Sequence, residues 1–443
     1  MGDQLTADAG DAIGQAVASL AWERLGRAPR LAVGRDNRPS GAALADGVLA
    51  GVVAAGGEAV DVGELPTPAL YFATHVLDVD GGVQVTGSHN PPQFNGFKTV
   101  LAGEAVYGAG IQHLRELIER GELAARPGGR RIARGAGLLA QYRAAVVERN
   151  GPLPRRVRVV VDCGNGVTSL VAVDTLRELG ADVVALFAES DGRFPNHHPD
   201  PTVVENLRDL QAAVRRERAE LGIAFDGDGD RIGAVDEAGQ VVFGDRLLVL
   251  LGRDLAERMG GGHHVIFDVK CSEVLPQELT RAGLVPLMWK TGHSLIKQKM
   301  KEVGAPLAGE MSGHMFFGGD WYGFDDALFA AARLLRYVAR RGGPLSRLLA
   351  DLPATVSTPE IRVDCPDEQK FALVERAVRH FGAKYPIATL DGVRITFADG
   401  WGLLRASNTQ PALVLRFEAH TQAALDAYQT ELEGWLREAG VQP

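Results

Sequence analysis

Cysteine is scarce in this 443-residue chain, and long apolar runs are missing. The three cysteines, Cys163, Cys271 and Cys365, are far apart in the sequence and odd in number. They predict reduced, mostly buried thiols, and they exclude a disulfide framework and paired zinc ligands. The most apolar stretch, residues 42–57, is interrupted by Asp46 and is too short and too polar to span a bilayer.

Positive charge is in deficit, with 47 basic residues against 56 acidic ones and a net charge of -9. Such a chain repels nucleic acid on average, so we expect no nucleic-acid partner. The first residues lack the basic region and the apolar core of a signal peptide. We therefore expect a cytoplasmic protein with no membrane partner.

The remaining composition is typical of a folded protein, with 46% hydrophobic and 23% charged residues. It excludes wholesale disorder, a collagen-like repeat and a chain-long coiled coil. The length predicts roughly three or four domains of ~100–150 residues each.

Short β-branched runs alternate with segments of helical apolar spacing through about the first 350 residues. This alternation predicts α/β units with mostly parallel, buried strands. The strand-like runs are 31–33, 83–85, 157–161, 223–225 and 265–269, and the helix-like segments include 111–118, 170–179 and 328–338. The last ninety residues instead predict strands at 392–397 and 412–418 around a loop, then a helix from 421 to about 438. We expect three similar α/β domains, 1–136, 137–240 and 241–353, and a smaller α+β domain, 354–443.

The sharpest motif is Asp226-Gly-Asp228-Gly-Asp230-Arg231, directly after the apolar run LGIAF. Carboxylates at a spacing of two project to one side of an extended segment, and their mutual repulsion favours a bound cation. All-oxygen ligands suit Mg²⁺. An acidic turn without metal is the alternative. An EF-hand is excluded because Arg231 occupies the loop position that requires glycine, and both flanks are strand-like.

A second motif, Thr86-Gly-Ser88-His89-Asn90-Pro-Pro, follows the strand-like run GGVQV. Its serine lies at an exposed, glycine-flanked corner, as a nucleophile requires, although a turn or cap residue would look the same. The pattern does not match the G-x-S-x-G of serine hydrolases. Lys98, a short distance downstream, carries a charge that can balance phosphate, as well as being an ordinary surface lysine.

Two further loops combine glycine with hydroxyls and charge. In Gly309-Glu310-Met-Ser312-Gly-His314, a carboxylate and a hydroxyl at a spacing of two suit the hydroxyls of a sugar. Alone, Glu310 is more typical of a salt bridge or a surface, and His314 of a packed histidine. Lys270 and the segment 290–293, which ends in His293, add polar groups beside glycine. Between the final strands, Arg405, Ser407, Asn408 and Thr409 form a candidate phosphate cradle, with an ordinary hairpin turn as the alternative.

The four loops fall one per predicted domain, which indicates a site assembled in a central cleft. With TGSHNPP, DGDGDR, GEMSGH and RASNTQP in this order, the chain resembles the α-D-phosphohexomutases, in the bacterial phosphomannomutase/phosphoglucomutase branch. FDVKC, WKTGHSLIK and FPNHHPDP match as well, and the likeness covers almost the whole chain. The phosphoglucosamine mutase branch more often has SASHNP and GEQSGH.

The resemblance implies reversible phosphoryl transfer between O1 and O6 of mannose and glucose phosphates through phospho-Ser88 and a hexose 1,6-bisphosphate, which also serves as activator. It implies Mg²⁺ bound by Ser88 and three aspartates: Asp226, Asp228 and Asp230. Candidates for proton transfer or charge neutralisation are Lys98, Arg231, His293 and His314. Sugar hydroxyls would contact Glu310 and Ser312, with Lys270 as another substrate contact. The substrate's phosphate would bind Arg405, Ser407, Asn408 and Thr409.

The resemblance also implies an N-terminal strand and an FRxYDIRG-like segment that this sequence does not contain. We therefore expect the first sheet to lack one strand, and the serine loop to lack an arginine and a tyrosine. A phosphoglucosamine mutase, an impaired sugar-phosphate-binding protein and a phosphoserine-dependent phosphatase are the alternatives. We expect a monomer whose partners are small sugar phosphates.

Overall fold

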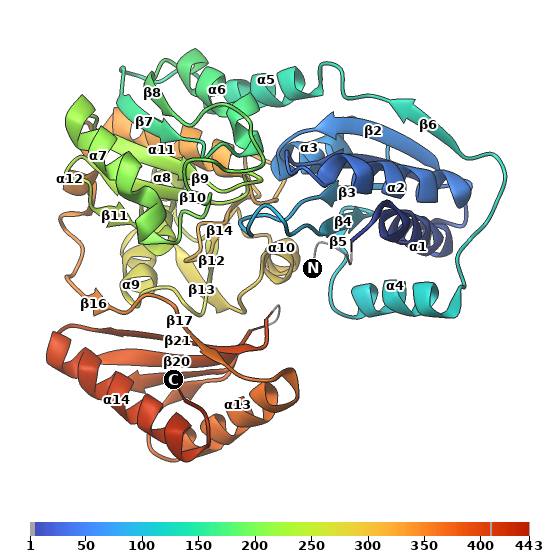
Figure 1. Cartoon of the computed structure of the whole chain (residues 1–443). Coiled ribbons are helices and arrows are strands. Elements are labelled where there is room, and N and C mark those ends of the chain that lie inside the picture. The colour runs from blue at the N-terminus through green and yellow to red at the C-terminus, as the bar shows by residue number, and fades with distance from the viewer. Residues whose placement is uncertain (1–4, 408–409, 443) are drawn as a thin grey trace.

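The computed structural model describes residues 5–407 and 410–442. Four sheets follow one another along the chain, and the last lies below the others in Figure 1. The expected three similar α/β domains and smaller α+β domain are confirmed. Within the described residues, no helix has the length and apolarity needed to cross a membrane.

The first unit is a mixed six-stranded sheet with the order β5-β4-β3-β1-β2-β6. Helices α1 and α2 of this unit cross so closely that a Cβ at Gly51 of α2 would lie 2.0 Å from a backbone oxygen of α1. Its elements are α1 (Ala7–Leu25), β1 (Arg30–Arg35), α2 (Gly41–Ala54), β2 (Glu58–Glu64), α3 (Thr67–Val76), β3 (Gly81–Val85), β4 (Phe97–Leu101), β5 (Glu104–Ala105), α4 (Ala109–Arg120) and β6 (Arg130–Ala133).

The second unit has a five-stranded sheet with the order β11-β10-β9-β7-β8. Its elements are α5 (Leu138–Asn150), β7 (Arg158–Asp162), α6 (Ala172–Glu178), β8 (Asp182–Leu186), α7 (Arg208–Glu217), β9 (Leu221–Phe225), β10 (Ile232–Asp236) and β11 (Val241–Val242), with 3-10 turns η1 (Val167–Leu170) and η2 (Val204–Leu207).

The third unit has a four-stranded sheet with the order β13-β12-β14-β15. Its elements are α8 (Gly244–Met259), β12 (His264–Asp268), α9 (Val274–Arg281), β13 (Val285–Trp289), α10 (His293–Val303), β14 (Leu307–Gly309), β15 (Met315–Phe317), α11 (Ala327–Arg341) and α12 (Leu345–Leu349).

The three sheets share one feature that positions the site. In each, a strand from the parallel part turns back into an antiparallel partner: β3 into β4, β9 into β10, and β14 into β15. The serine, aspartate and sugar motifs are the connections of these three pairs. Equivalent loops of three repeated units therefore meet at one place, which explains why the motifs recur once per unit.

The C-terminal sheet is antiparallel, and its helices α13 and α14 cover the face that points away from the other units (Figure 1). The sequence predicts a loop between the strands at 392–397 and 412–418, but β20 lies there. Its elements are β16 (Val356–Ser357), β17 (Ile361–Asp364), α13 (Asp367–Gly382), β18 (Ile387–Ala388), β19 (Val393–Phe397), β20 (Gly400–Ala406), β21 (Ala412–Ala419) and α14 (Gln422–Glu438).

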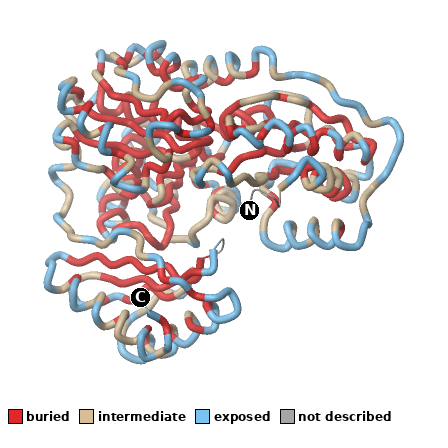
Figure 2. Tube along the Cα trace, in the orientation of Figure 1, coloured by how far each residue is buried: buried red, intermediate tan, exposed pale blue. Residues whose placement is uncertain are grey.

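Buried residues follow the sheets, and exposed ones lie on the outer helices and turns (Figure 2). One hydrophobic cluster continues through the first three units, whereas the C-terminal unit has its own core. All three cysteines are buried and unpaired, as expected. The domain limits stay a proposal: 136/137 lies between β6 and α5, 240/241 between the paired strands β10 and β11, and 353/354 between α12 and β16.

Candidate active site

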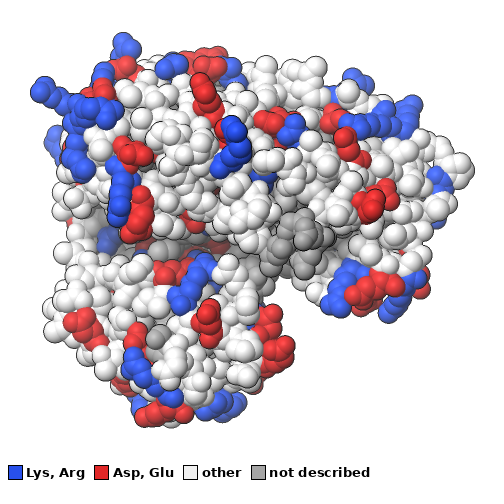
Figure 3. Space-filling view, viewed as in Figure 1, with Lys and Arg blue, Asp and Glu red and all other residues white. Residues whose placement is uncertain are grey.

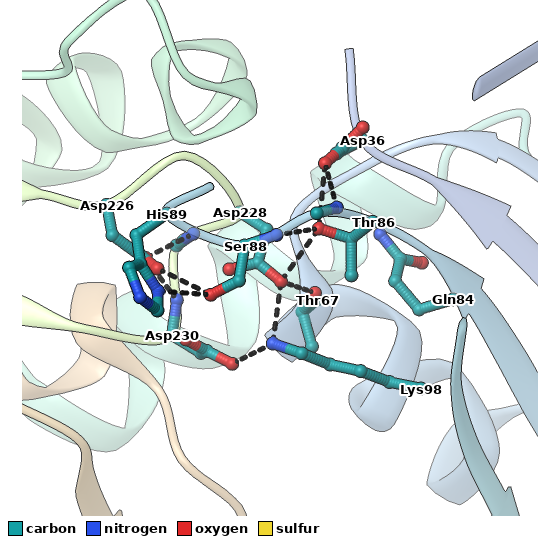
Figure 4. A network of polar contacts seen from close by, with 12 residues as sticks. Asp36, Thr67, Gln84, Thr86, Ser88, His89, Lys98, Asp226, Asp228 and Asp230 are labelled. Atoms are coloured by element: carbon teal, nitrogen blue, oxygen red, sulfur yellow. Dashed lines mark hydrogen bonds and ion pairs between the residues drawn. The ribbon is translucent and has the colours of Figure 1, made fainter. Parts of the chain in front are cut away.

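The serine loop connects β3 to β4 and brings Ser88 against the aspartate loop of the second unit (Figure 4). Ser88 has a φ of 50°, a left-handed conformation that is uncommon for a residue with a side chain. Its Oγ lies 3.2 Å from Oδ2 of Asp226 and 3.2 Å from Nδ1 of His89. The hydroxyl is therefore aimed at the carboxylates from a strained corner of the backbone.

The aspartate loop connects β9 to β10, and its three carboxylates are fully buried. Oδ1 of Asp226 accepts hydrogen bonds from the backbone N–H groups of Gly229, Asp230 and Arg231 at 2.9, 3.1 and 3.1 Å. Burial, followed by the charges of Asp228 and Asp230, raises the pKa of Asp226 well above its usual range. Backbone N–H groups thus hold the loop while its charges repel one another.

This carboxylate group fits a divalent cation. One ligand oxygen from each aspartate lies within 4.8 Å of the other two. Oδ1 of Asp228 and Oδ1 of Asp230 are buried without any hydrogen-bond partner. Unpaired anionic oxygens inside a protein are costly, and a hard cation with oxygen ligands satisfies them.

Lys98, on β4, supplies a positive charge from the first unit. Its Nζ lies 2.8 Å from Oδ2 of Asp228 and also donates to Asp230. Burial would lower the pKa of Lys98, but these two carboxylates hold it well above the usual value. Oδ2 of Asp228 also accepts from the hydroxyls of Thr67 and Thr86, at 2.5 and 3.1 Å. The lysine therefore joins the two units across the acidic loop.

Arg231 and His314 connect the aspartate loop to the sugar loop. They form an isolated antiparallel bridge, and Nε of Arg231 donates to Nε2 of His314 at 3.0 Å. Because Nε2 accepts this bond, Nδ1 carries the proton and faces Oδ2 of Asp325 at 3.1 Å. Asp325 also pairs with Lys297 at 2.9 Å. Neither Asp325 nor Lys297 is among the site residues that the sequence predicts.

His293 begins α10 beside this cluster, with its ring stacked on His314 at a centroid distance of 5.6 Å. Its Nδ1 lies 3.5 Å from Oδ2 of Asp325. Burial, followed by the charge of Lys297, lowers the pKa of His293 well below its usual value. This ring is therefore neutral at physiological pH.

The sugar loop carries Glu310 and Ser312 between β14 and β15. Glu310 is buried, and its Oε1 accepts from the backbone N–H of Gly292 at 2.6 Å. Burial raises the pKa of this carboxyl above its usual value. Ser312 is half-buried. The contact with Gly292 joins the sugar loop to the segment 290–293.

The candidate phosphate loop contacts the same segment from the C-terminal unit. Nε of Arg405 donates to Oδ2 of Asp391 at 2.9 Å, and the same oxygen accepts from the N–H of Thr291 at 3.1 Å. The buried ammonium of Lys370, another group that the sequence analysis missed, donates to the carbonyl of Ser407 at 2.6 Å. The predicted residues Asn408 and Thr409 lie outside the described residues.

Lys270 lies where the third and fourth units meet. Its Nζ is 3.1 Å from Glu360. Burial would raise the pKa of Glu360, but Lys270 lowers it to about 2. The C-terminal unit and the other units face each other across a hollow in the molecular surface (Figure 3).

Tertiary contacts that sequence spacing does not reveal explain the missed residues. Thr67 begins α3, 161 positions before its partner Asp228. The adjacent residues Asp325 and Asp326 precede α11 and resemble an N-cap signal. Asp326 does cap that helix, because its side chain accepts a hydrogen bond from the N–H of Phe329. That signal identifies the capping residue and not its neighbour Asp325.

The three α/β units and the C-terminal unit match, in order, the four domains of the phosphoglucomutase/phosphomannomutase family, over residues 1–124, 141–239, 243–356 and 360–434. The chain belongs to this family.

The phosphomannomutase/phosphoglucomutase of Pseudomonas aeruginosa is 46% identical over 99% of this chain and 93% of its own length. The phosphoglucomutase of Neisseria gonorrhoeae is 44% identical over 98% and 94%. The crystal structure of a family protein from Burkholderia thailandensis has a TM-score of 0.92 at 43% identity, and the match covers 99% of this chain and 95% of that one.

Proposed function

We propose that this protein is a phosphomannomutase/phosphoglucomutase that moves a phosphoryl group reversibly between O1 and O6 of mannose and glucose phosphates. The observation that carries the proposal is the contact of Ser88 Oγ with Asp226, beside two buried carboxylate oxygens without partners, in a member of this family. Ser88, Asp226, Asp228 and Asp230 would hold Mg²⁺. When bound, the ion would neutralise charge on the transferring phosphoryl oxygens.

In the resting enzyme, Ser88 Oγ carries the phosphoryl group. A substrate binds with its own phosphate on Arg405, Ser407, Asn408 and Thr409, and its free hydroxyl faces phospho-Ser88. That oxygen forms a bond to phosphorus while the bond from phosphorus to Oγ breaks. In-line positioning and charge neutralisation dominate such transfers, and Lys98 and Arg231 supply positive charge on the protein side.

His314 is our candidate to accept the hydroxyl proton. The pairing with Asp325 keeps the proton on Nδ1, so the basic lone pair is on Nε2. This lone pair becomes available to the substrate hydroxyl once Nε of Arg231 turns from it to the phosphoryl oxygens. His293, neutral and stacked on His314, is a second proton-transfer candidate.

The product of the first transfer is a hexose 1,6-bisphosphate, which also restores any dephosphorylated enzyme and so acts as an activator. It must turn end for end before its other phosphate returns to Ser88. Glu310, Ser312 and Lys270 would hold the sugar in either orientation. We also propose a cytoplasmic monomer without nucleic-acid or membrane partners.

A coupled assay tests this function. Purified protein receives Mg²⁺, a trace of hexose 1,6-bisphosphate and either glucose 1-phosphate or mannose 1-phosphate, and formation of the 6-phosphate is followed. We expect turnover that depends on the metal and disappears in Ser88→Ala. Preferential turnover of glucosamine 6-phosphate would identify a phosphoglucosamine mutase. Net release of inorganic phosphate would identify a phosphatase, and binding without turnover would identify an impaired member.

A further inference from the structure

A buried arginine outside the predicted motifs binds backbone carbonyls of the serine loop. Arg38 follows β1, and its side chain is 0% exposed. The Nη1 donates to the carbonyls of Pro91 and Phe94 at 2.6 and 3.1 Å. The Nη2 donates to the carbonyls of Ser88 and Asn90, both at 2.6 Å.

The fifth donor of this guanidinium is used as well. Nε of Arg38 donates to Oδ2 of Asp36 at 3.0 Å, and the same oxygen accepts from the hydroxyl of Thr86 at 2.7 Å and the N–H of Gly87 at 3.3 Å. A guanidinium has five N–H donors in a fixed planar fork. All five are therefore satisfied, four of them by the loop that carries the candidate nucleophile.

The sequence of the loop fits this contact. A Cβ at Gly87 would lie 2.6 Å from Cζ of Arg38, so the guanidinium occupies the space of the missing side chain. The guanidinium also stands over the ring of Phe194, with Cζ 5.2 Å from the ring centroid. Phe194 belongs to the FPNHHPDP segment of the second unit. Gly87 of the serine loop and Phe194 of that segment therefore both lie against the guanidinium of Arg38.

We propose that Arg38 is a positioning residue that fixes Ser88 in its left-handed conformation, with Oγ directed at Asp226. This inference rests on the proposed function. Four carbonyls bound to one rigid plane fix the path of the loop, and a left-handed serine persists only where its surroundings determine it. A displacement of about 1 Å can reduce a reaction rate about 100-fold, so a loosened loop slows transfer without altering the sugar-binding residues.

Arg38→Lys tests this role, because an ammonium retains the charge beside Asp36 but cannot bond four carbonyls in one plane. We expect kcat to fall by about 10- to 100-fold, while KM for glucose 1-phosphate changes less than about threefold. Amide hydrogen exchange should increase in residues 86–96. The matched control is Arg30→Lys at the other end of β1, where the arginine pairs with Glu58 far along the strand from the loop, and its kcat should equal that of the wild type.

Gly87→Ala is a second test if Arg38→Lys does not fold, because its methyl group would meet both the guanidinium, at 2.6 Å from Cζ, and the Phe94 carbonyl that the guanidinium binds, at 2.7 Å. The same lowered kcat and faster exchange are expected. A kcat per folded molecule within twofold of wild type, with only a lower melting temperature, would reduce Arg38 to a purely structural residue and overturn the proposal. Wild-type protein without mutase activity would contradict the proposed function instead, and hydrogen exchange would still decide whether Arg38 holds the loop.

Discussion

Replacement of Lys98 by methionine is expected to have opposite effects on metal affinity and on catalysis. Lys98 Nζ lies 2.8 Å from Asp228, and its side chain is 18% exposed. At an effective dielectric constant of about 20, this attraction is roughly 6 kcal/mol before the cost of desolvation. Removal of one partner from a buried ion pair typically costs about 3–5 kcal/mol. The metal-free variant should therefore be markedly less stable.

Calorimetry measures this loss. In metal-free buffer, the transition of the first three units, which share one hydrophobic cluster, should shift down by about 5–15 °C. Mg²⁺ should restore more stability to the variant than to the wild type, because the ion no longer meets a competing ammonium. Titration calorimetry at pH 8, where protons compete least for Asp226, should show tighter Mg²⁺ binding, while mutase turnover falls at least about 100-fold.

Lys301→Met is the matched control, because this lysine pairs with Glu104 on the surface, where both side chains are mostly exposed. Surface pairs of this kind contribute about 0–1 kcal/mol, so stability, metal affinity and turnover should stay unchanged. Weaker Mg²⁺ binding by the Lys98 variant, or an unchanged metal-free transition, would refute the assignment of Lys98 as the counter-charge of the acidic loop.

Three further changes test separate parts of the structure. Asp228→Asn should weaken Mg²⁺ binding at least about 100-fold in titration calorimetry, and unchanged binding would remove this carboxylate from the metal site. Lys270 lowers the pKa of Glu360 to about 2, so the ionised carboxylate stabilises the folded protein fully above pH ~4.5. This contribution, up to ~3 kcal/mol, is lost as pH falls toward 2. Acid unfolding of Lys270→Met should lack this loss, and identical acid profiles of variant and wild type would contradict the pairing. Gly51→Ala should destabilise the first unit by about 1–3 kcal/mol, because the new methyl group clashes with α1. In the control Gly434→Ala the methyl group meets nothing within 4 Å, so this variant should stabilise α14 by about 0.5–1 kcal/mol. Equal effects of the two substitutions in urea unfolding would exclude the close crossing of α1 and α2.

The four loops were predictable because each concentrates unusual residue types within a few positions. Three aspartates at a spacing of two, or a serine between glycine and proline, are visible without knowledge of the fold. The approach of Ser88 to Asp226 depends on equivalent loops of two repeated sheets meeting, and the sequence indicated this only through the resemblance of all four motifs to one family.

Residues that act through tertiary contacts could not be predicted in this way. Arg38 and Asp325 lie outside the motifs. The four carbonyls that Arg38 binds are 50–56 positions away, and the pairing of Asp325 with Lys297 depends on the fold, so neither position carries a local signal of its role. The strand β20 was missed because its glycines are typical of a loop, although Gly402 packs against the ring of Phe417, where a Cβ would lie 3.0 Å from that ring.

The central claim is that Ser88 carries the transferred phosphoryl group, and mass spectrometry tests it most directly. Protein incubated with hexose 1,6-bisphosphate and Mg²⁺ should gain about 80 Da, located by peptide mapping to Ser88. Addition of excess glucose 1-phosphate should remove the label, and Ser88→Ala should never acquire it. A phosphoryl group located at another residue, or undiminished mutase turnover in Ser88→Ala, would contradict the account.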